Sequence, residues 1–386
     1  MPPSPVALME ELIEEILLRF PPDDPAPLFR AALVCKAWCR LISAAAFRRR
    51  FRKIHRTPPL LGLICLGGGT SSLTGFSIEK TQFTPTSTFR LPSAKISNWR
   101  VIDALHGRIL FRDMVSLGSS GCSEFVVWSP ITGGEVRRLP MPCLRSMSWS
   151  AALLCASTVC DDHHLDCGYG AFAVVLVATH SNKGLTSVYI YSSEQHVWSE
   201  PISNQDWSVQ VIGGAGGSTA IVGKTVYFRC VHERTSKLLA HELCKQQLSF
   251  VSLPSVGRID VYDSFALKKA DEGKLGLLMV REDAKLSMWS REAAPDGDAD
   301  WTLQRVFELD KMLPPWVLWY HYKLFAAPSS NDVFVLKVDG LLFTLDLKSG
   351  RVTELLLHGW RADKDISHVF PYISFCIPCI VCPKDT

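Results

Sequence analysis

Short strand-like segments recur from about residue 57 onward, and this repetition constrains the fold more than any other feature of the sequence. Each unit holds β-branched and aromatic residues in runs of about four to eight, separated by Gly, Ser, Asn and Asp, as in antiparallel strands joined by turns. The units follow one another at intervals of about 45–60 residues. They read FVVWSPITGGEVRRLP, VYIYSSEQHVWSEP, LLAHELCKQQLSFVSLP, LSMWSREAAPDGDADWTL and LFTLDLKSGRVTEL.

A further hairpin pattern comes before most of these units, so that one repeat holds about four strands. These hairpins read ALHGRILFRD, IVGKTVYFRC, DEGKLGLLMV and SSNDVFVLKV. Four-stranded sheets repeated around an axis form a β-propeller, in which each sheet buries both faces against its neighbours. Roughly 330 residues at about 40–50 per blade predict six or seven blades, with Phe370–Val381 available as a closing strand. A β-sandwich, or a pair of them, would show similar strand spacing and is the alternative.

The first 56 residues have a helical period instead. Apolar residues recur there three or four positions apart, which predicts amphipathic helices. The first stripe consists of Leu8, Leu12, Ile13, Ile16, Leu17 and Phe20. A proline pair ends this helix, Pro27 opens a second, and a third begins near Val34. In the third helix Val34, Trp38, Leu41 and Ile42 share a face, and Phe47, Phe51 and Ile54 continue the period.

The strings ALMEELIEEILLRFPPDD and LFRAALVCKAWCRLISAAAFRRRF closely resemble the F-box, the adaptor-binding module of SCF ubiquitin ligases. VCKAWCRLIS is the most specific part of the match. The resemblance implies a module of three or four helices at residues 1–56 that binds a Skp-type adaptor and, through it, a cullin. F-boxes usually open with leucine-proline, whereas Met9 follows Leu8 here. Whether this departure weakens adaptor binding is open.

The resemblance carries the adaptor contact over to ten positions of this sequence, some of which will face inward. They are Leu8, Leu12, Ile16, Leu17, Leu28, Val34, Cys35, Trp38, Leu41 and Ile42. Among them, Trp38 is the residue type most often found at the energetic centre of an interface. The alternative is a helical cap packed on the rest of the chain, in which Trp38 and Leu12 are core residues.

Residues 57–386 form the second expected unit, a propeller-like interaction domain. The spacing of Tyr191 and Trp198, and the glycine pairs at 133–134 and 213–214, look like kelch repeats. Together the two parts resemble plant F-box proteins that carry a kelch-like or F-box-associated propeller. The expected fold class is therefore mainly β with a small all-α N-terminal module. The expected function is the substrate receptor of an SCF-type ligase, with an unidentified target protein bound by the β domain.

Two other functions compete with this prediction. One is a propeller enzyme or lectin with a helical cap, because a fold alone does not determine function. The other is an F-box protein whose role is not degradation. The sequence offers little for catalysis, since the GGGTSS segment at 67–72 lacks the lysine of a phosphate-binding loop and no serine lies in a G-x-S-x-G motif. No catalytic residue and no cofactor is expected.

Two groups of residues have metal-ligand chemistry. The first group is Cys376, Cys379 and Cys382, and the second is Cys155, Cys160, His163, His164 and Cys167. Structural zinc needs four nitrogen or sulfur ligands, usually as two pairs. The first group lacks a second pair, and the second requires its polar loop to fold back on itself. Buried strand residues and a hydrated loop are the favoured interpretations, so no metal is expected.

Charge and hydropathy exclude several broad classes. The formal net charge is only +3, which provides no global field for nucleic acid or anionic membranes. The basic run Arg48–Arg56 could be a local nucleic-acid patch, but the apolar stripe within it favours an ordinary solvated helix face. No apolar run approaches the roughly 20 residues that cross a bilayer. Thirteen scattered cysteines and an acidic start favour a reducing compartment, cytosolic or nuclear.

Overall fold

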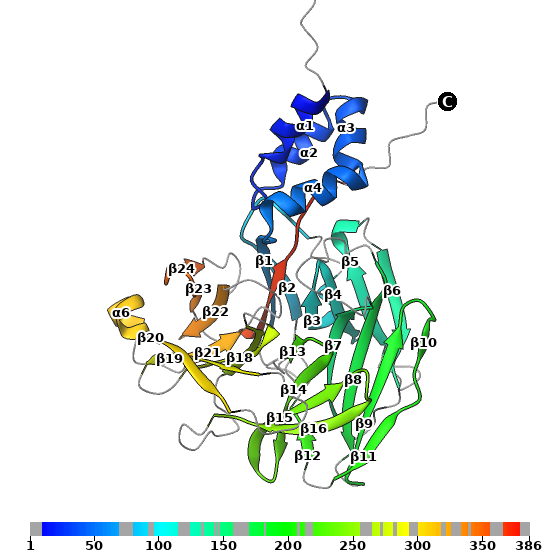
Figure 1. Ribbon diagram of the computed structural model, residues 1–386, viewed down its shortest axis with the longest axis vertical. Helices are drawn as coiled ribbons and strands as arrows, with labels where there is room; N and C mark the ends of the chain where they lie inside the picture. Colours follow the sequence, from blue (N-terminus) through cyan, green and yellow to red (C-terminus); the bar gives the residue numbers. More distant parts are fainter. Residues whose placement is uncertain are drawn as a thin grey trace, which may run out of the picture.

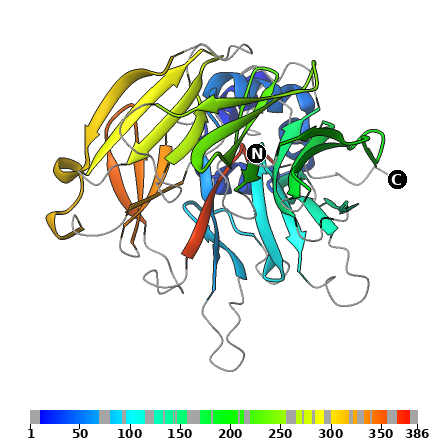
Figure 2. The ribbon, with the colours of Figure 1, turned by 90° about the horizontal axis from the view of Figure 1, so that it is seen from below.

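A small helical module lies above a ring of β-sheets in the computed structural model of the chain (Figure 1). Seen from below, the sheets surround an axis and the helices lie behind them (Figure 2). The described residues are 10–68, 80–91, 96–114, 124–132, 135–142, 144, 147–156, 170–180, 183–206, 209–212, 219–254, 265–270, 273–280, 284–292, 300–317, 322–325, 333–338, 341–355 and 366–378. The predicted fold class, mainly β with a small helical module at the N-terminus, is confirmed.

Six sheets, called blades 1 to 6, are built from the described residues. Blade 1 contains β1 (Leu60–Gly67), β2 (Lys80–Pro85) and β25 (Ile366–Ile373). Blade 2 contains β3 (Trp99–Leu105), β4 (Arg108–Asp113), β5 (Glu124–Ser129) and β6 (Glu135–Pro140). Blade 3 contains β7 (Ser148–Cys155), β8 (Phe172–His180), β9 (Leu185–Ser192), β10 (Val197–Trp198) and β11 (Ile202–Gln205).

The other three blades follow in chain order. Blade 4 contains β12 (Val209–Val211), β13 (Thr219–Val222), β14 (Thr225–His232), β15 (Thr235–Glu242) and β16 (Gln247–Ser252). Blade 5 contains β17 (Phe265–Lys269), β18 (Leu275–Val280), β19 (Lys285–Arg291) and β20 (Thr302–Glu308), and a short helix α6 (Leu309–Met312) follows it. Blade 6 contains β21 (Tyr322–Phe325), β22 (Val333–Val338), β23 (Leu341–Asp346) and β24 (Val352–Leu355). The strand pairs within these sheets are antiparallel. The propeller has six blades, which is the lower of the two predicted numbers.

The repeats found in the sequence correspond to fixed parts of the blades. The longer units form the outer strand pairs, for example β5 with β6 and β23 with β24. The hairpins that precede them form the inner pairs, for example β3 with β4. That hairpin turns at His106 and Gly107, both with positive φ, of 49° and 77°. Glycine is required at 107 because an added Cβ would lie 2.7 Å from Ser374 Oγ.

Apolar clusters join neighbouring blades all the way around the ring. One spans blades 1, 2 and 3, and others join blades 3 and 4, 4 and 5, 5 and 6, and 6 and 1. As a result every residue of β18 is buried, because both faces of blade 5 are covered. Its outermost strand, β20, is exposed from Thr302 to Val306. Burial on both faces explains why the inner strands read as continuous apolar runs rather than alternating ones.

Two tryptophans add hydrogen bonds between outer strands of neighbouring blades. Trp198 Nε1 of blade 3 donates to the carbonyl oxygen of Pro140 in blade 2 at 2.7 Å. Trp301 Nε1, just before β20, donates to the carbonyl of Ser252 in blade 4, also at 2.7 Å. The ring of Trp198 lies 5.4 Å from that of Tyr191, centroid to centroid. The spacing that looked kelch-like thus brings two aromatic rings together at a contact between blades.

Strand β25 closes the ring. It pairs with β1, with Leu63 opposite Pro371 and Cys65 opposite Val369, and lies beside β3 and β21, the innermost strands of blades 2 and 6. The predicted closing strand, Phe370–Val381, was wrong in its limits, because β25 ends at Ile373. Residues 374–378 leave the sheet and run up to the helices, as the red segment of Figure 1 shows.

The helical module consists of α1 (Glu10–Leu18), α2 (Ala26–Ala32), α3 (Lys36–Ser43) and α4 (Ala45–His55). Pro21 and Pro22 follow α1 and Pro27 lies in the first turn of α2, as the sequence predicts. The third helix, predicted to begin near Val34, begins two residues later at Lys36, with Cys35 as its N-cap. Ile54 was expected on the buried stripe of α4 but is 52% exposed.

Candidate functional site

The inward faces of the four helices form one core. Its buried members are Leu17, Leu18, Leu28, Ala31, Ala32, Ile42, Phe47 and Phe51, together with Phe375 and Ile377 from the segment after β25. Trp38 and Leu41 are partly buried against it. Five of the ten residues expected at an adaptor interface therefore face inward in whole or in part. They are Leu17, Leu28, Trp38, Leu41 and Ile42.

Four of the other predicted contact residues are exposed, and Leu8 lies outside the described residues. Leu12 and Ile16, one turn apart on α1, are 47% and 50% exposed. Val34 is 65% exposed, and Cys35 beside it is exposed as well. These exposed side chains lie on the outer surface of the module, its outward face, whereas the inner face is filled by the core. The helical-cap alternative placed Leu12 in the core, and the exposure of this residue contradicts that placement.

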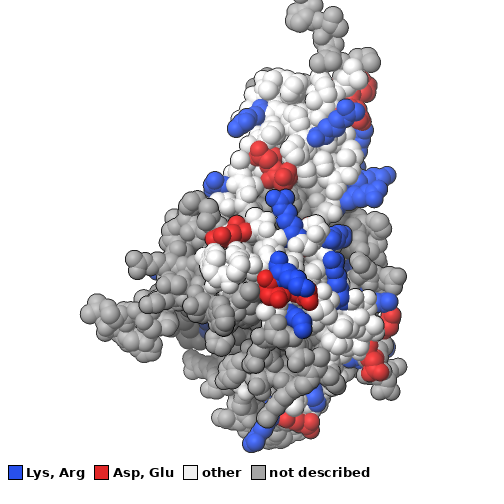
Figure 3. Space-filling view, turned by 90° about the vertical axis from the view of Figure 1, so that its left-hand side faces the viewer, with Lys and Arg blue, Asp and Glu red and all other residues white. Residues whose placement is uncertain are grey.

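Two exposed apolar residues were not among the sequence-predicted contacts. Leu33, the C-cap of α2, is 77% exposed, and Phe29 on the same helix is 40% exposed. Leu33 directly precedes Val34, so α2 and the turn after it contribute three of the exposed apolar side chains. The sequence gives no signal that would place Leu33 on the outside, because it is an apolar residue at the end of a short amphipathic helix. In Figure 3 the helical module, at the top, shows only scattered charges among white atoms.

Charged residues fasten α1 to α4. Arg50 contacts Glu14 at 2.8 Å and Glu15 at 2.6 Å. Arg50 and Glu15 are about half exposed and Glu14 is less exposed, and ion pairs near a protein surface contribute about 1 kcal/mol at most. His55 at the end of α4 also contacts the carbonyl of Leu18, with Nε2 3.0 Å from the oxygen. At least one member of the basic run thus has a role within the module.

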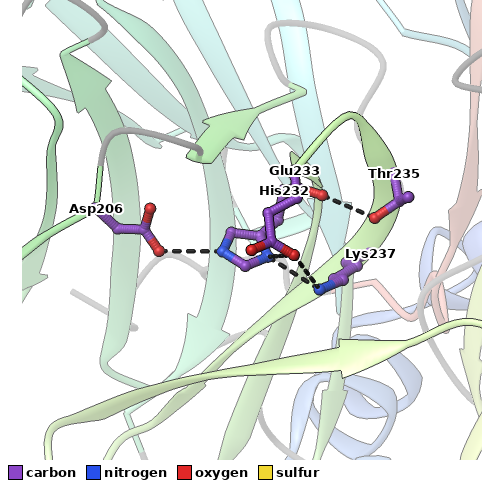
Figure 4. Close-up of polar contacts among 5 residues, drawn as sticks. All are labelled: Asp206, His232, Glu233, Thr235 and Lys237. Atoms are coloured by element: carbon purple, nitrogen blue, oxygen red, sulfur yellow. Dashed lines mark hydrogen bonds and ion pairs between the residues drawn. The ribbon is translucent and has the colours of Figure 1, made fainter.

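A cluster of charged side chains lies at the opposite end of the ring, in the turn between β14 and β15 (Figure 4). His232 Nε2 is 3.1 Å from Asp206 Oδ2, and Lys237 Nζ is 3.0 Å from His232 Nδ1. An ammonium group can only donate, so Nδ1 accepts and the ring proton lies on Nε2, where it is donated to Asp206. The imidazole also stacks on Phe250, with ring centroids 4.2 Å apart.

The turn that carries this cluster has an uncommon backbone. Glu233 and Arg234 have φ angles of 53° and 62°, the left-handed region that side chains other than glycine seldom adopt. Thr235 Oγ1 donates to the carbonyl of His232 at 2.7 Å and closes the turn. Contacts within the cluster therefore hold a strained hairpin whose tip projects Glu233 and Arg234 into solvent. The arrangement leaves a charged, exposed tip at this turn.

A buried carboxylate fastens blades 2 and 3 at their innermost strands. Asp103 Oδ2 accepts a hydrogen bond from the backbone N–H of Leu153 on β7 at 2.8 Å, and Oδ1 accepts one from Ala104 at 2.8 Å. Burial raises the pKa of Asp103 to about 6, although both hydrogen bonds act in the opposite direction. The residue is 4% exposed, so its role is in the contact between blades.

Metal ligands do not gather anywhere in the part of the chain that the structure describes. Cys376 is buried, and desolvation raises the pKa of its thiol to about 12, which leaves it a neutral apolar side chain. The other members of the first cysteine group lie outside the described residues. Of the second group only Cys155 is described, and it is half-buried. Neither metal hypothesis gains support.

None of the described helices has both the length and the apolar composition that a membrane crossing requires. The longest of those named above, α4, has eleven residues, of which three are buried in the module.

Comparison with known proteins identifies the helical module. The model of the F-box domain matches residues 8–50, which covers all four helices except the last five residues of α4. The F-box/kelch-repeat protein At3g61590 of Arabidopsis thaliana is 23% identical over 258 residues. This match covers 65% of the present chain but 57% of the relative, so the chain spans little more than half of that protein's length. An F-box domain at the N-terminus is thus established.

Solved structures resemble the chain only distantly. An α-L-arabinanase of Penicillium chrysogenum complexed with arabinobiose has a TM-score of 0.39 at 10% identity, with 77% of this chain and 86% of that chain covered. The Dos1 propeller has a TM-score of 0.35 at 9% identity, with coverages of 76% and 67%. One of two prolyl endopeptidases has a TM-score of 0.36 at 11% identity, and only 36% of that chain is covered. Scores this low say nothing about function.

Proposed function

We propose that this chain, with its F-box domain at residues 8–50 and a six-bladed propeller after it, is the substrate-recognition subunit of an SCF-type ubiquitin ligase. The outward face of the helices binds a Skp-type adaptor and, through it, a cullin. The propeller binds a target protein. No catalytic step belongs to the chain itself, because ubiquitin transfer depends on holding the target near the enzymes that perform it. This function places the protein in the cytosol or the nucleus.

One observation carries the proposal. The helical module fills its inner face with residues of its own chain and still exposes Leu12, Ile16, Leu33 and Val34. Large apolar side chains gathered on so small a module mark a surface that another protein covers. Full burial of an exposed side chain of this size contributes about 1.5–3 kcal/mol. Leu12 and Ile16 are already about half buried and contribute about half as much, so the four together offset part of the entropic cost of association.

The target is assigned to the end of the ring away from the helices. The adaptor and the helices occupy the other end, whereas the β14–β15 turn with Glu233 and Arg234 projects from this one (Figure 1). An enzyme or lectin would need polar groups that converge on a substrate in the channel. The His232 network lies in a turn between the second and third strands of its blade and is occupied in holding that turn.

The test uses surface substitutions that leave the helical core intact. Leu12→Asp and Val34→Asp each place a charge on the outward face, and we expect each to weaken binding of a recombinant Skp-type adaptor by at least tenfold. Ile54→Asp is the matched control, since Ile54 is exposed on α4 but is not a predicted contact. Trp38 is a poorer choice because it packs against the core. Equal adaptor binding by all three variants and the unmodified chain would refute the proposal.

A receptor that does not promote degradation needs a separate measurement. Affinity purification with the cullin inhibited retains targets that would otherwise be destroyed. A protein that is captured in larger amounts under inhibition, and that requires the propeller for capture, is the expected result. Targets whose abundance is independent of the cullin would instead indicate a role without degradation.

A further inference from the structure

We propose that Phe375 and Ile377 are positioning residues for the adaptor-binding helices, so that the F-box domain becomes competent to bind only when β25 has closed the propeller. The adaptor surface is then built from two ends of the chain that are more than 300 residues apart. This inference rests on the proposed function, because it assumes that the outward face of the helices binds an adaptor.

The two side chains complete the core of the helical module. Phe375 is 8% and Ile377 1% exposed, and both lie in the apolar cluster of the helices rather than in a cluster of the ring. The ring of Phe375 meets that of Phe51 edge to face, with centroids 6.2 Å apart. Phe51 in turn lies 6.0 Å from Phe47. A large part of the inner face of α4 therefore packs, directly or through Phe51, on a residue from the far end of the sequence.

The residue between them points the other way. Cys376 is buried in the apolar cluster of blades 1 to 3, together with Tyr372. Successive side chains of an extended segment alternate between its two sides. Residues 375–377 therefore lie between the helices and the ring and belong to both cores. Any change that removes this segment opens the two cores at once.

The segment is held in place from the ring side. The backbone N–H of Ser374 donates to the carbonyl of Pro59 at 3.2 Å, where the chain passes from α4 into β1. Tyr372 donates its hydroxyl to the carbonyl of Gly107 at 2.9 Å. Pairing of β25 with β1 includes Tyr372 and ends at Ile373, directly before Ser374, so the position of Phe375 follows from ring closure.

A polar link between helices and ring is weak by comparison. Thr88 Oγ1 donates to Asp24 Oδ1 at 2.6 Å, an oxygen that also accepts the backbone N–H of Ala26 at 3.1 Å. The hydrogen bond between Thr88 and Asp24 is exposed to water, so it contributes little to stability. The apolar contacts of residues 375 and 377 are the stronger tether.

A helical module of this size depends on the apolar contacts of Phe375 and Ile377 for its stability. A chain of about 50 residues buries too little apolar surface to offset its conformational entropy with a margin. Two of the ten fully buried residues of its core come from outside the module. The helices are synthesised first, but their core is completed last, because Phe375 and Ile377 follow β25 and β25 follows every other described strand in the chain. A receptor whose propeller has not closed would then be kept out of the ligase.

The experiment compares two double variants of the full chain with the same spacing and similar volume loss. Phe375→Ala with Ile377→Ala opens the helical core. Phe334→Ala with Leu336→Ala opens the core between blades 5 and 6, where both residues are buried. Adaptor affinity is measured with a recombinant Skp-type adaptor, and folding of the ring by near-ultraviolet circular dichroism. Trypsin reports on α4 separately, because exposed Arg49, Arg50 and Lys53 become cleavable when that helix opens.

We expect the first pair to lower adaptor affinity at least tenfold and to expose α4 to trypsin while the signal of the ring persists. Phe375→Met with Ile377→Leu refills the core and should restore both properties. The blade variant should leave affinity and α4 protection unchanged at a temperature where its ring remains folded. Unchanged affinity and protection in the first pair would overturn the inference. Failure of the unmodified chain to bind the adaptor would refute the proposed function instead, and the protease comparison would still decide whether the segment positions the helices.

Discussion

Ionisation of Asp103 should make the stability of the propeller depend on pH in a direction opposite to that of most carboxylates. Burial raises the pKa of this carboxyl from 3.8 to about 6 in the folded protein. The folded state therefore binds the proton more tightly than the unfolded state does. The stabilisation from protonation is fully present below pH 3.8 and is lost as the pH rises through about 6.

The size of the effect follows from the shift. A difference of about two pKa units corresponds to about 3 kcal/mol in the free energy of unfolding, and about 2 kcal/mol of this falls between pH 4.5 and 7.5. Other groups titrate in the same range, so the contribution of Asp103 is isolated with Asp103→Asn. The amide oxygen of asparagine can accept only one of the two backbone N–H groups of Leu153 and Ala104. The variant should therefore be less stable throughout, by about 1–3 kcal/mol even at neutral pH.

The assay is urea unfolding of both proteins at several pH values, monitored by tryptophan fluorescence. We expect the stability difference between the unmodified protein and Asp103→Asn to be about 2 kcal/mol larger at pH 4.5 than at pH 7.5. A difference that is constant with pH would show that the carboxyl titrates normally. A difference that grows toward high pH would show that the hydrogen bonds to the anion outweigh its desolvation. Either result would refute the reasoning.

Two further predictions concern ring closure and the contacts between blades. Gly107→Ala places a Cβ 2.7 Å from Ser374 Oγ and forces alanine into a left-handed conformation. Gly223→Ala is the control, because Gly223 also has a positive φ but has open space around it. Gly107→Ala should therefore lower the unfolding temperature clearly more than Gly223→Ala does. Equal shifts would mean that the contact with Ser374 is unimportant. Trp198→Phe keeps the aromatic contact with Tyr191 and removes the hydrogen bond to Pro140, which should cost about 1 kcal/mol in thermal or urea unfolding. A loss of several kcal/mol would point to packing rather than to the hydrogen bond.

The sequence alone predicts most of the architecture, because its helical period and its repeated strand pairs each have a physical cause. Residues three to four apart share a helix face, and repeated strand pairs demand neighbours on both sides, which leads to the propeller. The sequence cannot predict which face of a helix packs inward. Leu12 and Leu17 belong to the same predicted apolar stripe of α1, yet Leu17 is buried and Leu12 is 47% exposed. Only the positions of the other helices decide between them.

Segment 374–378 shows a second limit. Phe375 and Ile377 alternate with Cys376 as in a buried strand, and the sequence was interpreted that way. The alternation is real, but one side packs on helices and the other on the ring. Periodicity describes the local geometry of an extended segment and carries no information about which partner covers each side. Asp103 is similar, since a carboxylate within an apolar run gives no sign of the backbone donors it will meet.

The shared segment has a consequence for how a ligase of this kind would work. If the adaptor binds one end of the molecule and the target the other, transfer depends on how constant the distance between them is. A flexible linker would spread the target over a large volume and lower its effective concentration near the transferring enzyme. Here residues 375–377 contribute to the core of the helices and to that of the ring together, and the chain crosses between the two beside the same segment at Pro59. Two adjacent crossings with interlocked cores favour a stiff connection, which would keep a target bound to the ring at a constant distance from an adaptor bound to the helices.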